Sequence, residues 1–137
     1  MAKALDKEIE NIQIYLELQK LRFSKEDDIT ISMETEGNFE NRKIAPMMLI
    51  VLAENAFKHG IDIDKKSFIH IKISLIGDEI HFNIKNSTHK NANHLKEYSG
   101  IGLENIQKRL ELLTSGKHNL VIKEENDSFT ANLVLKL

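Results

Sequence analysis

Two kinds of apolar periodicity follow one another along the chain, and their order limits the fold more than any other feature of the sequence. Residues 4–23 carry apolar side chains at spacings of three and four, the period of an α-helix: Leu5, Ile9, Ile12, Leu16 and Phe23. Residues 29–33 instead alternate apolar and polar positions, which predicts a strand with one buried face. The polar residues 34–43, around Gly37, are expected to end that strand.

A second helix is predicted between Pro46 and Gly60. Proline suits the first turn of a helix, and Gly60 is expected to cap its end. One continuous face of this helix is apolar and comprises Leu49, Leu52, Ala53, Ala56 and Phe57.

The second half of the chain repeats both kinds of pattern. Two alternating runs, residues 69–75 and 80–84, are joined by Gly77-Asp78, which predicts a β-hairpin. The polar residues 87–99 have no period and predict a long loop. After it come a third helix, whose apolar positions are Leu103, Ile106, Leu110 and Leu113 and which should stop near Gly116, and two closing strands around residues 120–122 and 129–137.

The order of these elements lacks the strict alternation that an all-parallel sheet requires. It predicts an α+β two-layer α/β sandwich, with a mixed five-stranded sheet and helices on one face. We expect one domain, residues 1–137, in which residues 1–23 form an N-terminal linker helix. That helix carries a second apolar stripe, Ile14, Leu18 and Leu21, which either burial within its own domain or a homodimer contact would explain.

The composition excludes several classes of protein. The absence of cysteine rules out disulfides, thiolate metal sites and cysteine nucleophiles. Nineteen Lys+Arg against 21 Asp+Glu give a formal charge of -2, which argues against nucleic acid or an anionic membrane as the main partner. The apolar runs are far shorter than the roughly 20 residues of a membrane span, and the N-terminus lacks a secretory apolar block. We therefore expect a soluble, cytoplasmic chain without membrane contact of its own.

Four polar side chains gather on the second predicted helix. On a helical wheel, Glu54, Asn55, Lys58 and His59 share an arc of roughly 140° opposite the apolar face. This arc is either a solvated surface, with a Glu54–Lys58 pair worth only about 0.3–0.5 kcal/mol, or the wall of a ligand site.

Two further features favour a ligand site. Gly100-Ile101-Gly102-Leu103 directly precedes the third helix, where glycines allow close backbone approach and the helix N-terminus offers N–H groups to an anion. Glycines before a helix are also found in plain turns. Asn86 continues the inward phase of residues 80–84, so a polar side chain is expected at the end of a buried face, where backbone or a ligand must pair with it.

In this order the motifs resemble the nucleotide site of the GHKL ATPase/kinase superfamily. Residues 54–60 are similar to its N box, and residues 100–103 to its second glycine box. The flanking residues 15–23, 44–46 and 102–110 narrow the resemblance to the ATP-binding end of LytS-like sensor histidine kinases.

The resemblance implies a Bergerat fold that binds ATP and Mg²⁺. Asn55 would hold the Mg²⁺, as a hard cation prefers oxygen ligands, and Glu54 would orient or deprotonate the accepting group. The other nucleotide-binding positions would be Lys58, His59, Asn86, Gly100, Ile101, Gly102, Leu103 and Asn105, with His59 alternatively capping its helix. Residues 87–99 would form a lid over the nucleotide.

The resemblance also implies a reaction and partners. The γ-phosphoryl group of Mg-ATP would pass to a histidine on a dimerisation segment of the same parent protein, for relay to a response regulator. The parent would be a membrane-anchored bacterial receptor of which this chain is the cytoplasmic part.

Two departures from the superfamily pattern leave alternatives open. The usual first glycine box is replaced by Asn86-Ser87-Thr88-His89, and no phospho-accepting histidine motif precedes Tyr15. An asparagine can accept a hydrogen bond from the adenine amino group, but it can also donate one. The alternatives are a stand-alone serine/threonine kinase of the anti-sigma-factor type and a non-catalytic nucleotide-sensing or dimerisation module.

Overall fold

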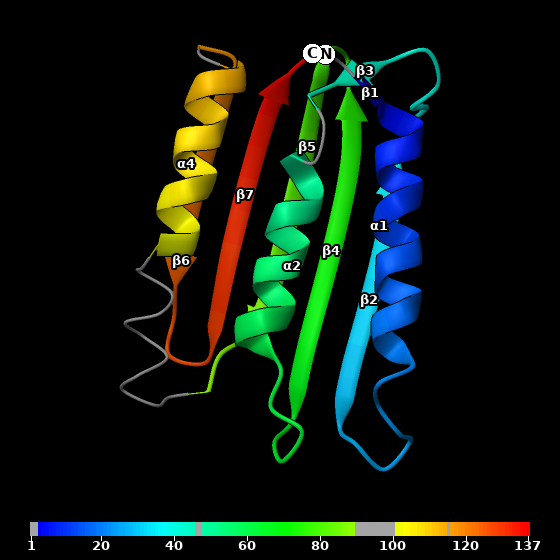
Figure 1. Cartoon of the computed structure of the whole chain (residues 1–137), viewed down its shortest axis with the longest axis vertical. Helices are drawn as coiled ribbons and strands as arrows, with labels where there is room; N and C mark the ends of the chain where they lie inside the picture. The colour runs from blue at the N-terminus through cyan, green and yellow to red at the C-terminus, as the bar shows by residue number, and fades with distance from the viewer. Residues whose placement is uncertain (1–2, 46–47, 90–100, 115) are drawn as a thin grey trace.

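The computed structural model describes residues 3–45, 48–89, 101–114 and 116–137. Its helices lie over one face of a single large sheet (Figure 1). They are α1 (Leu5–Lys20), α2 (Met48–Gly60) and α4 (Ile101–Thr114). The strands of the sheet are β2 (Ile29–Glu36), β4 (Ser67–Ile76), β5 (Glu79–Ser87), β6 (His118–Glu124) and β7 (Ser128–Lys136).

The sheet is mixed, with strand order β2-β4-β5-β7-β6. The β2 strand runs parallel to β4, and the remaining neighbours are antiparallel. Gly77 has a positive φ of 59°, as the tight turn between β4 and β5 requires. The structure therefore confirms the predicted α+β sandwich, its five-stranded mixed sheet and its hairpin.

One core fills the space between the helices and the sheet. The inward positions of β4, Ile69, Ile71 and Ile73, are buried beneath the helices, as are their partners on β5 and β7. All five apolar positions predicted for α2 are buried, so its apolar face fixes the rotation of the helix over the sheet. This rotation decides which side chains of α2 remain available for chemistry.

Several predicted boundaries and positions are wrong. The β2 strand continues to Glu36, because backbone pairing with β4 along its whole length does not need apolar side chains. On α4, Leu113 is half-exposed, and Thr114 takes the buried position one turn after Leu110. The Thr114 hydroxyl donates to the Leu110 carbonyl at 2.7 Å, which makes its burial tolerable.

A short second sheet was not predicted. It pairs β1 (Lys3–Ala4) with β3 (Lys43–Ile44) in antiparallel fashion. The Leu5 amide also donates to the Arg42 carbonyl at 2.9 Å. These bonds attach the first residue of α1 to the segment that precedes α2.

Some predictions fall outside the described residues. They are the role of Pro46 in starting the second helix, the body of the predicted loop and lid over residues 90–99, and Gly100. Within the described ranges, no helix has the length and apolar composition needed to span a membrane.

Candidate functional site

Three elements meet at one end of the sheet. The C-terminal end of α2, the last residues of β5 and the N-terminal end of α4 all lie there (Figure 1). Helix α4 also packs against α2. The two glycine-containing segments and the inward strand end that the sequence singled out are therefore brought together by the fold.

The polar face of α2 is largely open. Glu54 and Lys58 are exposed and Asn55 is partly exposed, because the apolar face of the helix is turned to the sheet. Among the described residues, no ion pair joins Glu54 to Lys58, although they lie one turn apart. A carboxylate, an amide oxygen and an ammonium group are thus presented on adjacent turns.

His59 differs from the prediction. The helical wheel grouped it with the open polar face, but only 7% of its surface is exposed. The last turn of α2 packs against β5, so the ring is enclosed where the helix meets the sheet. Burial favours a role at the helix end over a contact with a solvated phosphate group.

Asn86 lies at the floor of this region, at the inward end of β5. It has no exposed surface, as the strand phase predicts, and its Nδ2 donates to the Ser87 carbonyl at 2.9 Å. A backbone group therefore pairs with the amide's donor end.

Gly60 closes the contact between α2 and Asn86. A Cβ atom at Gly60 would lie 2.9 Å from both Cβ and Nδ2 of Asn86, closer than real Cβ contacts. Gly60 is also the last residue of α2 and is absent from the glycines with positive φ. The helix ends at Gly60, as predicted, but the glycine is needed there for the close approach of Asn86 and not for a positive φ.

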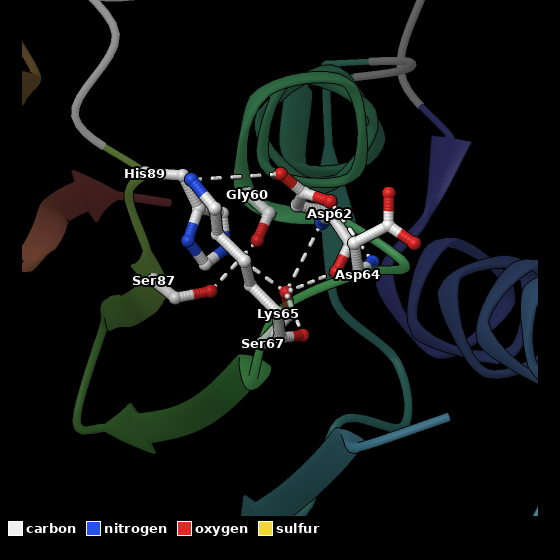
Figure 2. A network of polar contacts seen from close by, with 7 residues as sticks. All are labelled: Gly60, Asp62, Asp64, Lys65, Ser67, Ser87 and His89. Atoms are coloured by element: carbon white, nitrogen blue, oxygen red, sulfur yellow. Dashed lines mark hydrogen bonds and ion pairs between the residues drawn. The ribbon is translucent and has the colours of Figure 1, made fainter. Parts of the chain in front are cut away.

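A network of hydrogen bonds holds the end of α2 to the strand ends (Figure 2). The Ser87 hydroxyl donates to the Gly60 carbonyl at 2.7 Å and accepts from the Phe68 amide at 3.0 Å. The Ser67 hydroxyl accepts from the Asp62 amide at 3.0 Å and lies 2.9 Å from Nε2 of His89. The segment that follows β5 therefore starts from a fixed position beside α2.

The sequence did not reveal Ser67 as part of the site, and it placed Ser87 in the predicted lid and not at the junction with α2. Both residues lie at strand ends and are buried. Because serine is polar, the pattern of apolar residues in the sequence does not indicate that burial. Ser87 directly follows the inward Asn86, so strand alternation predicts that it faces outward. Ser87 is buried because the end of α2, at Gly60, packs beside it and accepts a hydrogen bond from its hydroxyl.

The N-terminus of α4 carries the predicted second glycine box in part. Ile101, Gly102 and Leu103 form the first turn of the helix, where backbone N–H groups have no partner within the helix. Asn105, in the next turn, is exposed. Within the described part of the chain, no group of three His, Cys, Asp or Glu residues is arranged to hold a metal ion.

Helix α1 adds a tyrosine beside α2. The Tyr15 ring meets the Phe57 ring edge-on, with centroids 5.5 Å apart. Burial raises the pKa of the Tyr15 phenol, the Glu54 carboxylate raises that pKa further, and the Arg22 guanidinium lowers it. The sequence motif contained Tyr15 but gave it no role.

Comparison with known proteins gives sequence relatives among sensor kinases, although no protein-family model matches. The chain is 31% identical over 121 residues to the sensor histidine kinase/phosphatase LytS of Staphylococcus aureus, covering 78% of this chain and 20% of that protein. It is 26% identical over 148 residues to the sensor protein LytS of Oceanobacillus iheyensis, covering 96% of this chain and 24% of that protein. The sensor protein kinase HptS of S. aureus is 34% identical over 77 residues, which are 56% of this chain and 14% of HptS. The chain thus spans less than a quarter of the length of these relatives.

Solved structures share the fold at low sequence identity. The catalytic domain of the histidine kinase ThkA superposes with a TM-score of 0.67 at 16% identity, covering 99% of this chain and 95% of that domain. A histidine kinase domain from Erythrobacter litoralis gives a TM-score of 0.68 at 11% identity, covering 100% of this chain and 65% of that one. The predicted resemblance is confirmed: the homologues of this chain are LytS and HptS sensor histidine kinases, and its fold is that of a histidine kinase catalytic domain.

Proposed function

We propose that the chain is the ATP-binding catalytic domain of a two-component sensor histidine kinase. It transfers the γ-phosphoryl group of Mg-ATP to a histidine on a dimerisation segment of its parent protein. The observation that carries the proposal is the meeting of three features at one end of the sheet: the open polar face of α2, the buried Asn86 and the N-terminus of α4.

The residues present suit a magnesium nucleotide. Asn55 offers an amide oxygen, a ligand type that Mg²⁺ accepts, and Lys58 on the next turn offers an ammonium group to phosphate. The backbone of residues 100–103 and the side chain of Asn105 hold the outer phosphates at the positive end of α4. Asn86, with its amide donor already paired to Ser87, accepts from the base.

Both the nucleotide and the residues of the chain contribute to the proposed reaction. Mg-ATP supplies the transferable phosphoryl group and a metal that neutralises its charge. Glu54 orients the accepting imidazole and takes its proton as the phosphorus–nitrogen bond forms and the bond to the ADP oxygen breaks. His59, enclosed at the end of α2, stabilises the helix terminus rather than the phosphate.

The parent protein and its partners extend the same proposal. A crystal structure exists of ThkA in complex with the response regulator TrrA, and we assign this chain's parent a response regulator partner as well. The parent is a membrane-anchored receptor with residues 1–137 as one cytoplasmic domain. Residues 1–23 link that domain to the phospho-accepting segment and contact a second copy of the chain.

A thermal-shift titration tests nucleotide binding. Mg-ATP at a hundredfold excess over Kd stabilises a folded protein by about 2.7 kcal/mol, so Tm should rise by several degrees. Asn55→Ala should make the shift independent of Mg²⁺, whereas Asn119→Ala, on the exposed edge strand β6, should behave as wild type. No shift at millimolar Mg-ATP contradicts the proposal.

A phosphoryl-transfer assay separates the catalytic domain from a non-catalytic nucleotide module. The chain alone should bind ATP without becoming phosphorylated. When the phospho-accepting segment is joined to it, label from γ-phosphate should appear on histidine. Nucleotide binding without transfer in the joined protein would favour the non-catalytic module.

A further inference from the structure

The peptide group between Ser87 and Thr88 is held from both sides, directly after the buried Asn86. Its carbonyl, that of Ser87, accepts from Nδ2 of Asn86 at 2.9 Å. Its amide, that of Thr88, donates at 2.9 Å to the carbonyl of Asp127, in the connection between β6 and β7. A peptide group is planar and rotates as one unit, so a rotation would break both bonds together. The orientation of the Asn86 amide is therefore set by this peptide group.

His89, the residue after Thr88, is bonded to the segment that connects α2 to β4 (Figure 2). Its Nε2 atom lies 2.9 Å from the hydroxyl oxygen of Ser67, at the start of β4. That oxygen also accepts from the Asp62 amide at 3.0 Å. The hydroxyl lies within donating distance of the carbonyls of Asp62 and Lys65, at 3.1 and 3.2 Å. Only 1% of Ser67 is exposed, so its hydrogen bonds depend on these protein groups.

The hydrogen-bond capacity of the Ser67 hydroxyl fixes the direction of its contact with His89. A hydroxyl has one proton to donate and two lone pairs with which to accept. The carbonyls of Asp62 and Lys65 can only accept, so the proton points to them, and the Asp62 amide uses one lone pair. The remaining lone pair faces His89, whose Nε2 therefore carries a proton and donates. Every hydrogen-bonding position of this buried hydroxyl is then filled.

We propose that His89 is a positioning residue for the nucleotide base: its bond to Ser67 fixes the chain beside the Ser87–Thr88 peptide group, which orients the Asn86 amide. The inference rests on the proposed role of Asn86 as the acceptor for the base. With Nδ2 bonded to the Ser87 carbonyl, the amide oxygen is the end that accepts from a base. A 6-amino purine donates to an oxygen, whereas a 6-oxo purine has an acceptor at the same place. His89 therefore supports the preference for a 6-amino purine through Asn86.

Calorimetric titration of the 137-residue chain with Mg-ATP and with Mg-ITP, which has a 6-oxo group, tests this role. The wild-type chain should bind Mg-ATP more tightly than Mg-ITP. His89→Ala removes the bond to Ser67 and should raise Kd for Mg-ATP about three- to tenfold, the scale of one hydrogen bond. Kd for Mg-ITP should stay nearly unchanged, because that nucleotide does not donate to Asn86. A general loss of folding would instead weaken the binding of both nucleotides equally.

Three variants serve as controls for the titration. His89→Gln should bind both nucleotides as wild type does, because the glutamine nitrogen reaches the position of Nε2 and can donate to Ser67. In a Ser67→Ala background, His89→Ala should have no further effect on either Kd, because the acceptor is already absent. His70→Ala, at an exposed histidine on β4 whose ring contacts the Ser32 hydroxyl, should also bind as wild type does.

Amide hydrogen exchange, followed by NMR on the chain without nucleotide, tests the link between His89 and the peptide group. The Thr88 amide donates to the Asp127 carbonyl, so it should exchange slowly in wild type and faster in His89→Ala. His89→Gln should restore the slow exchange. The Lys136 amide, which donates to the Lys117 carbonyl at the other end of β7, should exchange equally in all three proteins.

The outcomes separate this inference from the proposed function. A wild-type chain that binds neither nucleotide overturns the proposed nucleotide site, and the positioning role falls with it. Equal Kd values for the two nucleotides in wild type overturn the role of Asn86 as acceptor for the base. If wild type prefers Mg-ATP but His89→Ala leaves both Kd values unchanged or raises them equally, only the positioning role is overturned. Unchanged exchange of the Thr88 amide in His89→Ala, or a His89→Gln variant that behaves like His89→Ala, also overturns it.

Discussion

At the scale of single residues, both the fold and the site depend on the absence of a Cβ atom at Gly60. A glycine inside a helix usually lowers stability by about 0.5–1 kcal/mol relative to alanine. Here the missing Cβ lets the last turn of α2 touch Asn86, which is fully buried. At this position glycine is therefore expected to be more stabilising than alanine, because of the close contact with Asn86.

Gly60→Ala should accordingly destabilise the chain by about 1–3 kcal/mol, the range for overpacking a filled site. Urea denaturation measures this change in the free energy of unfolding. In an Asn86→Gly background, which removes the atoms that the new Cβ would meet, Gly60→Ala should have a smaller effect. Equal effects in the two backgrounds would show that the contact with Asn86 is not the cause.

The sequence predicted the environment of a residue correctly where a single periodic pattern determines which way its side chain faces. Strand phase alone placed Asn86 on the buried face, and the structure agrees. His59 was misplaced because a helical wheel describes an isolated helix and carries no information on where the helix end meets the sheet. Gly60 ends α2 as predicted, but its contact with Asn86 was not predicted, because the sequence shows that a glycine is present and not which residue packs against it.

At the scale of elements, the hydroxyl of Ser87 joins a helix to two strands. The Ser87 hydroxyl donates to the Gly60 carbonyl at the end of α2 (Figure 2). It accepts from the Phe68 amide near the start of β4. Without it, two backbone groups at a buried junction lose their partner. The orientation of the polar face of α2 relative to Asn86 depends on this junction.

Ser87→Ala should lower the free energy of unfolding by about 1–3 kcal/mol, the effect of leaving buried polar groups unpaired. Ser74→Ala is the matched control. Ser74 is also buried in a strand, but its side chain makes no hydrogen bond among the described contacts, so its loss should change stability by less than about 0.5 kcal/mol. Chemical denaturation of both variants makes the comparison, and equal losses would remove the special role of Ser87.

The sequence predicted which segments are helices and which are strands, but not which strands pair. Apolar periodicity predicted the three helices and the five long strands, because each of them buries one face over several residues. The β1–β3 pair has two residues per strand, too few for any period. The parallel pairing of β2 with β4 depends on which strand the chain returns to after α2, and alternation within β2 contains no such information.

At the scale of the whole molecule, α1 has an apolar stripe that its own domain does not cover. Ile14, Leu18 and Leu21 are 50%, 59% and 82% exposed, while the other stripe of the same helix is buried in the core. Burial within the domain, one of the two explanations that the sequence left open, is therefore wrong for this stripe. A second copy of the chain is the occupant assigned to it under the proposed function.

Sedimentation velocity over a range of protein concentrations tests that assignment. The chain should show a concentration-dependent dimer, because apolar surface removed from water favours association. Replacing Leu18 and Leu21 with serine should yield a monomer. Leu112→Ser, at an equally exposed leucine on α4, should leave the dimer intact. A wild-type chain that sediments as a monomer at every concentration would contradict the assignment.

The β1–β3 pair has a mechanical consequence. It holds the start of α1 at Leu5, while Tyr15 lies about 15 Å further along the helix, at a rise of about 1.5 Å per residue. If α1 tilts about its fixed start, its far end moves most. Over this length of about 15 Å, a tilt of about 4° at Leu5 displaces Tyr15 by about 1 Å. A displacement of that size is enough to make or break a hydrogen bond. The end of α1 that carries Tyr15, packed edge-on against Phe57 of α2, is therefore the part of the helix that such a tilt displaces most.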